Sequence, residues 1–259
     1  MIPDKLSELK RYDDRAREML SADAAALSSA RGGAQSVREI YRAPYLRYEA
    51  HIGRLVRPEQ VVLEIGSGTG VHTAPLVGTG ARVVATDISV NALRVTRYRV
   101  SDRVSAAAAD MEELPFASAS FDVVACAGSL SYGEPSAVDT EIRRVLKSDG
   151  IFVCVDSLRN NPIYTMKRWL DYMRGKRTKR TLAYMPSDER VTSIAAGFTT
   201  ATVEYFGAAS FAMPALAGLL GESRAARLSD VIDRRVRTRR SAFKFVLVGV
   251  RPRPASRPT

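Results

Sequence analysis

The sequence is poor in residues that bind metal ions. Its 259 residues include two cysteines and two histidines, whereas protein zinc sites gather several such side chains together. Cys126 and Cys154 both lie within apolar runs typical of buried strands. We therefore expect no metal site, and we expect both cysteines to be buried, reduced thiols.

The sequence also lacks a long hydrophobic run. No apolar stretch approaches the roughly 18 residues that a transmembrane helix needs. The polar start, residues 1–5, does not resemble the apolar core of a signal peptide. Hydrophobic residues make up 46% of the chain, which is enough for the core of one large α/β domain. These features predict a cytoplasmic protein without a transmembrane segment.

Acidic residues are scarce in the last two-fifths of the chain. Residues 1–156 contain 19 Lys and Arg against 21 Asp and Glu, a net charge of −2, whereas residues 157–259 contain 20 against 7, a net charge of +13. This asymmetry bears on the substrate or partner and says little about the fold.

The strongest local signal is residues 61–70, with the sequence VVLEIGSGTG. A short apolar run ended by glycine predicts a strand buried on both faces. Glycines at every second position allow a turn that a ligand can approach closely. A helix starting near Val71 would direct its N-terminal amides at the same turn. Together they predict a nucleotide-type site at the carboxyl edge of a parallel sheet.

The glycine spacing bears on which nucleotide binds. The dinucleotide fingerprint is G-x-G-x-x-G, but Val71 stands where its third glycine would be. The spacing therefore disfavours NAD and FAD. The stretch resembles the E/D-x-G-x-G-x-G motif of Rossmann-like methyltransferases that use S-adenosylmethionine (SAM).

Further segments follow in the order expected of that family. Residues 82–87 and 104–110 each predict a strand that ends in an acid, and the first acid, Asp87, comes 23 residues after Glu64. Residues 114–124 match the pattern L-P-F-x-x-x-S-F-D-x-V. That pattern is highly specific to the type 11 methyltransferase domain, which residues 58–156 resemble.

The resemblance implies a fold, a cofactor and a set of cofactor-binding residues. The fold is an α/β, Rossmann-like, doubly wound and mostly parallel seven-stranded sheet with an antiparallel last strand. SAM would be the cofactor and S-adenosylhomocysteine (SAH) the product. Asp87 would accept hydrogen bonds from both ribose hydroxyls, and Asp110 one from the adenine amine; the alternatives are a helix cap and a turn residue. The implied cofactor-binding residues are Glu64, Gly66, Ser67, Gly68, Gly70, Asp87, Ile88, Asp110, Met111, Ala127 and Tyr45.

Fewer residues indicate the acceptor side. Many relatives carry a histidine in the loop after the fourth strand, where it can act as a base, but this chain has Ser131 and Tyr132. A tyrosine with a pKa near 10 is a poor base at pH 7, so the catalytic residue stays open, with Tyr132 as its candidate. Tyr132, Asn161 and Tyr41 are candidate substrate contacts, and core or lid packing is the alternative for Tyr41.

The chain divides into three predicted parts. Residues 1–56 form a helical N-terminal cap, residues 57–250 the SAM-binding domain, and residues 251–259 a proline-rich, disordered tail. A turn at residues 147–150 should precede strand five. A helical insertion at about residues 160–190 should follow it. Seven basic residues lie within 167–180, so this insertion is either a lid over the active site or a solvated helix face.

The predicted function is transfer of a methyl group from SAM to an O, N or C atom of a small acceptor. The basic C-terminal part suggests an anionic, glycan-linked or lipid-linked acceptor. One alternative is an RNA methyltransferase, because basic and aromatic residues interleave near 164–184. Another is a non-catalytic SAM-fold binding protein, which the intact acids disfavour. Contact with an anionic membrane surface is a further alternative for the basic region, and the oligomeric state is undefined.

Overall fold

The computed structural model describes residues 3–21, 32–100, 104–209, 212–235, 239 and 241–253. The strands are β1 (Val61–Ile65), β2 (Arg82–Asp87), β3 (Val104–Ala108), β4 (Phe121–Ala127), β5 (Leu146–Ser157), β6 (Phe198–Phe206) and β7 (Lys244–Pro252). The helices are α1 (Pro3–Ser21), α3 (Ala43–Leu55), α4 (Thr73–Val77), α5 (Val90–Val100), α6 (Pro135–Val145), α7 (Pro162–Met173), α8 (Lys179–Ala183), α9 (Asp188–Ala196), α10 (Met213–Leu220) and α11 (Glu222–Arg235). Short 3₁₀ turns are η1 (Gly33–Ser36), η2 (Glu39–Tyr41) and η3 (Leu130–Tyr132).

The strands form one seven-stranded sheet in the order β3-β2-β1-β4-β5-β7-β6. Strands β1 to β5 pair in parallel, and β7 runs antiparallel to both β5 and β6. This arrangement confirms the predicted mostly parallel sheet with an antiparallel last strand. The carboxyl ends of β1 to β5 meet at one edge, and β7 begins at that same edge because its direction is reversed.

Local sequence signals account for where several helices begin. Pro44 lies in the first turn of α3, where its missing N–H is not needed. Glu134 caps α6 by accepting a hydrogen bond from the Ala137 N–H at 2.7 Å. Asn161 caps α7 by accepting one from the Tyr164 N–H at 3.0 Å. Each cap directly precedes a proline at the first helical position.

Two boundaries differ from the prediction. The predicted turn at residues 147–150 lies inside β5, because the register with β4 shifts there: Phe121 pairs with Leu146, but Val123 pairs with Ile151. The predicted disordered tail began at Arg251, yet β7 continues to Pro252, which pairs with Phe198. Backbone pairing with β6 orders those two residues. Residues 254–259 of the predicted tail, and residues 22–31 of the predicted cap, lie outside the described residues.

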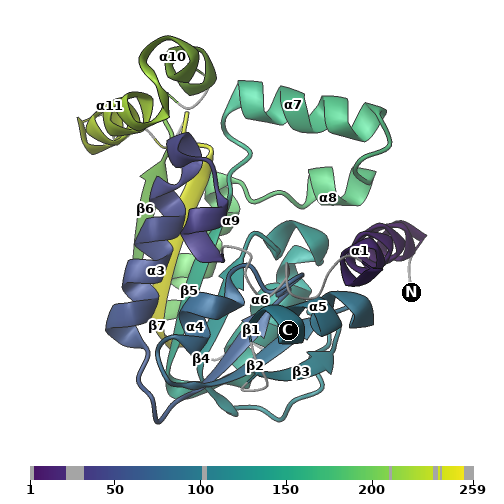
Figure 1. The fold of residues 1–259 in the computed structure, drawn as a ribbon. Helices are drawn as coiled ribbons and strands as arrows, with labels where there is room; N and C mark the ends of the chain where they lie inside the picture. The colour runs from purple at the N-terminus through teal and green to yellow at the C-terminus, as the bar shows by residue number, and fades with distance from the viewer. Residues whose placement is uncertain are drawn as a thin grey trace.

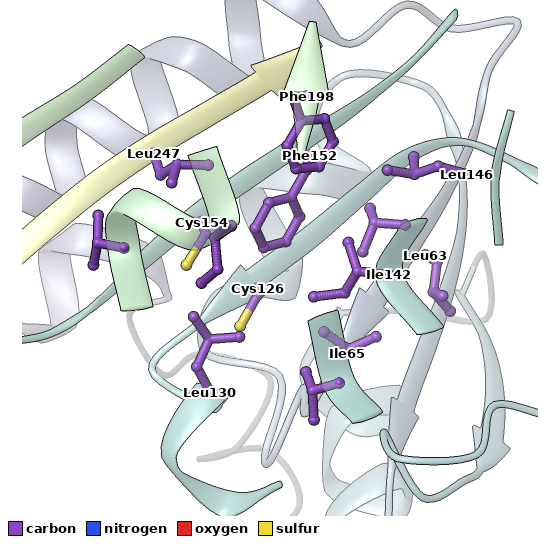
Figure 2. Close-up of a cluster of buried hydrophobic side chains, with 14 of the residues drawn as sticks. Leu63, Ile65, Cys126, Leu130, Ile142, Leu146, Phe152, Cys154, Phe198 and Leu247 are labelled. Carbon is purple, nitrogen blue, oxygen red and sulfur yellow. The ribbon is translucent and has the colours of Figure 1, made fainter. Parts of the chain in front are cut away.

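Helices cover both faces of the sheet (Figure 1). On one face, α3 and α4 pack on β1, β4, β5 and β7 through Tyr48, Ile52 and Leu76. On the other face, α6 and α9 pack over a core that includes Phe152, Leu247 and both cysteines (Figure 2). The two thiols are free and buried, as predicted.

The remaining helices lie towards the carboxyl edge and one end of the sheet. α1 packs on α5 through Ala16, Ala92 and Val95. Figure 1 shows α7 and α8 above that edge, with α8 close to α1. Within the described ranges, no helix combines the length and apolar character needed to span a bilayer.

Candidate cofactor and acceptor site

A cavity of about 570 Å³ lies at the carboxyl edge of the sheet. Its floor comes from the ends of β1, β2, β3 and β4 and the loops that follow them. Its walls come from α1, α3 and the start of α8. The predicted residues that line it are Tyr45, Gly66, Ser67, Gly68, Asp87, Ile88, Asp110, Met111, Ala127 and Tyr132. The topology therefore brings these predicted residues, which are up to 87 positions apart in the sequence, around one cavity.

The glycines after β1 serve two different purposes. Gly68 lines the cavity at a φ of +55°, and a Cβ built there would meet no atom within 4 Å. Gly70 does not line it; at a φ of +75°, a Cβ would lie 2.9 Å from the Thr96 backbone on α5. Gly68 thus leaves space for a ligand, whereas Gly70 permits close packing of the loop on α5.

Asp87, at the end of β2, is held rigidly. One carboxylate oxygen accepts a hydrogen bond from the Gly68 N–H and the other from the Ser89 N–H, both at 2.9 Å. Burial raises the pKa of this carboxyl, although the backbone hydrogen bonds oppose that rise. Each oxygen keeps a second acceptor position, so the carboxylate is able to receive two ligand hydroxyls at the cavity wall.

Asp110 and its neighbour Glu112 connect β3 to α1 and α8. The Lys5 ammonium of α1 forms ion pairs with Asp110 and, at 2.9 Å, with Glu112. Glu112 also accepts from the Arg180 guanidinium at 2.5 Å. Lys5 is 7% exposed and Arg180 12%, so this network is largely shielded from water. It joins the walls from α1 and α8 to the end of β3 at the cavity.

Glu64 lies beneath the cavity and does not line it. It is 2% exposed, and its carboxylate accepts a hydrogen bond from the Thr73 hydroxyl at 2.5 Å. Burial raises its pKa to about 7, partly offset by that hydrogen bond. Although the sequence placed Glu64 among the cofactor-binding residues, its contacts join the end of β1 to the start of α4. It therefore shapes the glycine loop from below.

Two aromatic side chains form another wall. The rings of Tyr45 and His72 stack with centroids 4.8 Å apart, and both residues line the cavity. Burial, together with the Lys244 charge, lowers the pKa of His72 to about 4. His72 is thus neutral at pH 7, and its buried Nδ1 has no hydrogen-bond partner among the described residues.

Tyr132 lines the cavity from η3, directly after the β4 loop. Its hydroxyl contacts the Tyr12 hydroxyl of α1 and lies 3.4 Å from an Arg177 nitrogen. Burial and the proximity of Tyr132 raise the pKa of Tyr12 well above its ordinary value. The pair therefore connects α1 to the loop after β4.

The two other predicted acceptor residues lie away from the cavity lining. Asn161 caps α7 with its oxygen and donates from its nitrogen to the Ser241 carbonyl at 2.7 Å. The Tyr41 ring packs edge-on against Phe243, with centroids 5.6 Å apart. Both side chains serve contacts within the protein in this structure.

The sequence prediction missed the residues that α1 and α8 contribute. Lys5, Glu8 and Tyr12 line the cavity from α1, and Thr178 and Thr181 line it at the start of α8. No local motif marks these residues. The sequence showed only that Lys5 is charged and that residues 176–180 are mostly basic. Neither feature specifies which acidic side chain these residues contact.

The residues present fit an adenosyl ligand. The buried Ser67 hydroxyl lacks a hydrogen-bond partner within the described part of the chain. A Cβ at Gly128, which also lines the cavity, would meet no atom within 4 Å. The site thus offers open space beside its glycines, the Ser67 hydroxyl and two acids at strand ends. These features match a ligand with ribose hydroxyls and an exocyclic amine.

Comparison with known proteins gives consistent results. Residues 63–154 match the family model described as "Methyltransferase domain". The demethylmenaquinone methyltransferase of Clavibacter sepedonicus is 38% identical over 122 residues, which cover 44% of this chain and 47% of that protein. The chain thus spans about half the length of the curated relatives that it matches.

Solved structures share the fold at low sequence identity. Phosphoethanolamine N-methyltransferase 2 of Haemonchus contortus has a TM-score of 0.56 and 18% identity, covering 81% of this chain and 53% of the other. Geranyl diphosphate C-methyltransferase of Streptomyces coelicolor A3(2) has a TM-score of 0.57 and 16% identity, covering 82% of each chain. Residues 63–154 thus match the methyltransferase-domain model, and the sheet around them has the fold of these solved methyltransferases.

Proposed function

We propose that the protein transfers a methyl group from SAM to a small-molecule acceptor. The observation that carries this proposal is the placement of the glycine loop, Asp87 and Asp110 around one cavity, with α1 and α8 as its walls. A cavity of about 570 Å³ lies within the range typical of small-molecule sites.

Each part of the site has a defined task in that function. Asp87 would bind the ribose hydroxyls of SAM. Asp110 and Met111 would contact its adenine. Gly66 and Gly68 would allow the amino-acid end of SAM to lie against the backbone. Bound SAM supplies an already activated methyl group, so the protein has to orient the acceptor and exclude water. The walls built from α1 and α8, which contact each other through Glu8 and Thr178, suit that task.

A small acceptor is favoured over RNA because several basic residues are committed to contacts within the protein. Arg180 pairs with Glu112, and Arg168 bonds to Ser157 and Tyr164. These guanidinium groups are not part of an open basic surface. The curated relatives are named demethylmenaquinone methyltransferases, which makes a quinol one acceptor to assay.

Calorimetric titration with SAM and SAH tests the proposal. The protein should bind both, and Asp87→Ala should weaken each affinity about 10- to 150-fold, because a charged hydrogen-bond acceptor contributes about 1.5–3 kcal/mol. Asp122→Ala is the matched control. Asp122 also accepts from a backbone N–H, that of Val61 at 2.8 Å, but at the start of β1 on the opposite edge.

Asp122→Ala should leave SAH affinity unchanged while it lowers stability. Equal SAH affinity in the wild type and Asp87→Ala would refute the ribose assignment. No SAM binding by the wild type would refute the methyltransferase proposal itself. Incubation with methyl-labelled SAM and a metabolite extract, followed by mass spectrometry, would then identify the acceptor.

A further inference from the structure

Two cationic side chains meet at one buried hydroxyl beside the cavity. Lys244, the first residue of β7, pairs in register with Ser157, the last residue of β5. The Lys244 ammonium lies 3.3 Å from the Ser157 hydroxyl oxygen, and an Arg168 nitrogen of α7 lies 3.2 Å from the same oxygen. The Tyr164 hydroxyl completes the group at 2.9 Å from Ser157, and it also contacts Arg168.

These cations lack the carboxylate partners that other buried cations here possess. Lys5 and Arg180 form ion pairs with acids, but no described carboxylate lies within 4 Å of Lys244 or Arg168. Burial would lower the pKa of Lys244, but Tyr45, Tyr164 and Asp156 raise it above its ordinary value. Asp156 already accepts from the backbone N–H groups of Leu130 and Ser157. Lys244 is only 7% exposed, so water compensates its charge poorly.

The arrangement creates a local positive potential. Burial alone would raise the pKa of Tyr164, yet the charges of Lys244 and Arg168 and the hydrogen bonds from Ser157 and Arg168 bring it below its ordinary value. Two like charges that share one neutral oxygen repel each other. An anion placed between them would replace that repulsion with charge-assisted hydrogen bonds.

We propose that Lys244, Arg168, Tyr164 and Ser157 form a subsite for an anionic oxygen group, a phosphate or a carboxylate, carried by the methyl acceptor. The ammonium of Lys244 lies over the Tyr45 ring, 4.9 Å from its centroid, and Tyr45 lines the cavity. The Tyr45 ring thus lies between the subsite and the cavity. The statement that the bound anion belongs to a methyl acceptor rests on the proposed methyltransferase function. The statement that the subsite binds an anion does not depend on that function.

The sequence suggested that the basic residues within 167–180 together select an anionic substrate. The subsite assigns this role to fewer residues. Arg174 and Lys176 are exposed, and Arg177 contacts Tyr132. The cation best placed to meet an acceptor beside Tyr45 is Lys244, which lies outside residues 167–180. The buried charge of Lys244 also differs from exposed charges because salt screens it much less.

Titration with inorganic phosphate tests the subsite directly. The wild type should bind phosphate saturably at millimolar concentration, and Lys244→Met and Arg168→Gln should each weaken binding at least about tenfold, as expected for a lost charge-assisted bond. Arg174→Gln, on the exposed part of the same segment, should bind phosphate as the wild type does. SAH affinity should be unchanged in all three variants. Parallel titration with acetate shows which of the two anionic groups the subsite prefers.

A stability measurement separates binding from a structural role. Without phosphate, Lys244→Met should be at least as thermally stable as the wild type, because it removes a buried charge without a carboxylate partner. Added phosphate should raise the melting temperature of the wild type and not of Lys244→Met. If Lys244→Met fails to fold, phosphate titration of Arg168→Gln, on the largely exposed α7, tests the subsite independently.

The subsite is refuted if the wild type does not bind phosphate, or if both variants bind it with wild-type affinity. Failure of the wild type to bind SAH is a separate result. That result would defeat the proposed function and the assignment of the anion to a methyl acceptor, while leaving the phosphate measurement valid.

Discussion

At the scale of single residues, Glu64 is a buried acid without a cationic partner within 4 Å among the described residues. Its pKa, raised by burial to about 7, means that the folded protein holds a proton that the unfolded chain releases near pH 4.5. As pH rises through this window, the unfolded state binds fewer protons than the folded state, so stability falls. The residue that leads the glycine loop therefore makes the fold pH-sensitive.

Glu64→Gln should remove this contribution, because glutamine keeps an acceptor for Thr73 but does not titrate. Relative to the wild type, the unfolding free energy of Glu64→Gln should rise by about 3 kcal/mol between about pH 5 and about pH 8. Urea unfolding across this range measures it. Glu59→Gln, which changes an exposed glutamate, should follow the wild-type profile. Parallel profiles for Glu64→Gln and the wild type would contradict the buried-acid interpretation.

At the scale of elements, α1 is a wall of the cavity that combines apolar packing with polar contacts. Its buried packing on α5 rests on small residues such as Ala16 and Ala92, and polar bonds hold it elsewhere. Asp13 accepts from the Ser89 hydroxyl at 2.8 Å and from the Asn91 amide at 2.9 Å, both at the start of α5. Because these two bonds are partly exposed, we expect α1 to open for ligand exchange.

Asp13→Ala should loosen α1 and increase the rate of SAH dissociation about tenfold, since two net hydrogen bonds contribute about 1–3 kcal/mol. Stopped-flow displacement of SAH measures this rate. Asp14→Ala is the control, because Asp14 pairs with no described residue except Arg17 and is 48% exposed. Equal dissociation rates in Asp13→Ala and the wild type would show that these bonds do not hold the cavity closed.

At the scale of the whole molecule, the sheet depends on a strand from the far end of the chain. β7 lies between β5 and β6, so its side chains complete the core begun by residues 63–154. Leu247 is fully buried beside Cys154 and Phe152 (Figure 2). The part that matches the family model therefore packs against residues outside the match.

Leu247→Ala should lower the unfolding free energy by about 2–5 kcal/mol, the range for deleting a buried leucine side chain. Urea unfolding tests this, with Leu219→Ala as control because Leu219 is 81% exposed. The control should change stability by no more than about 0.5 kcal/mol. A loss of similar size in both variants would show that β7 is not integral to the core.

The sequence alone determined the parallel strands, the glycine turn and the acids at strand ends. Those features depend on local patterns: short apolar runs, glycine spacing and an acid directly after a strand. Parallel strands then bring Asp87 and Asp110 to one edge whatever the remaining chain does. The family resemblance, the sheet and the residues closest to the predicted adenosyl position could accordingly be predicted.

Only the tertiary structure decided which side chains meet across long separations. Lys5 contacts Asp110 across 105 residues, and Lys244 contacts Ser157 across 87. Nothing in either local pattern specifies these partners, because a charged side chain matches many others equally well. The packing of α1 on α5 and the reversed direction of β7 select them. The walls of the cavity and the paired cations beside it therefore follow from the fold.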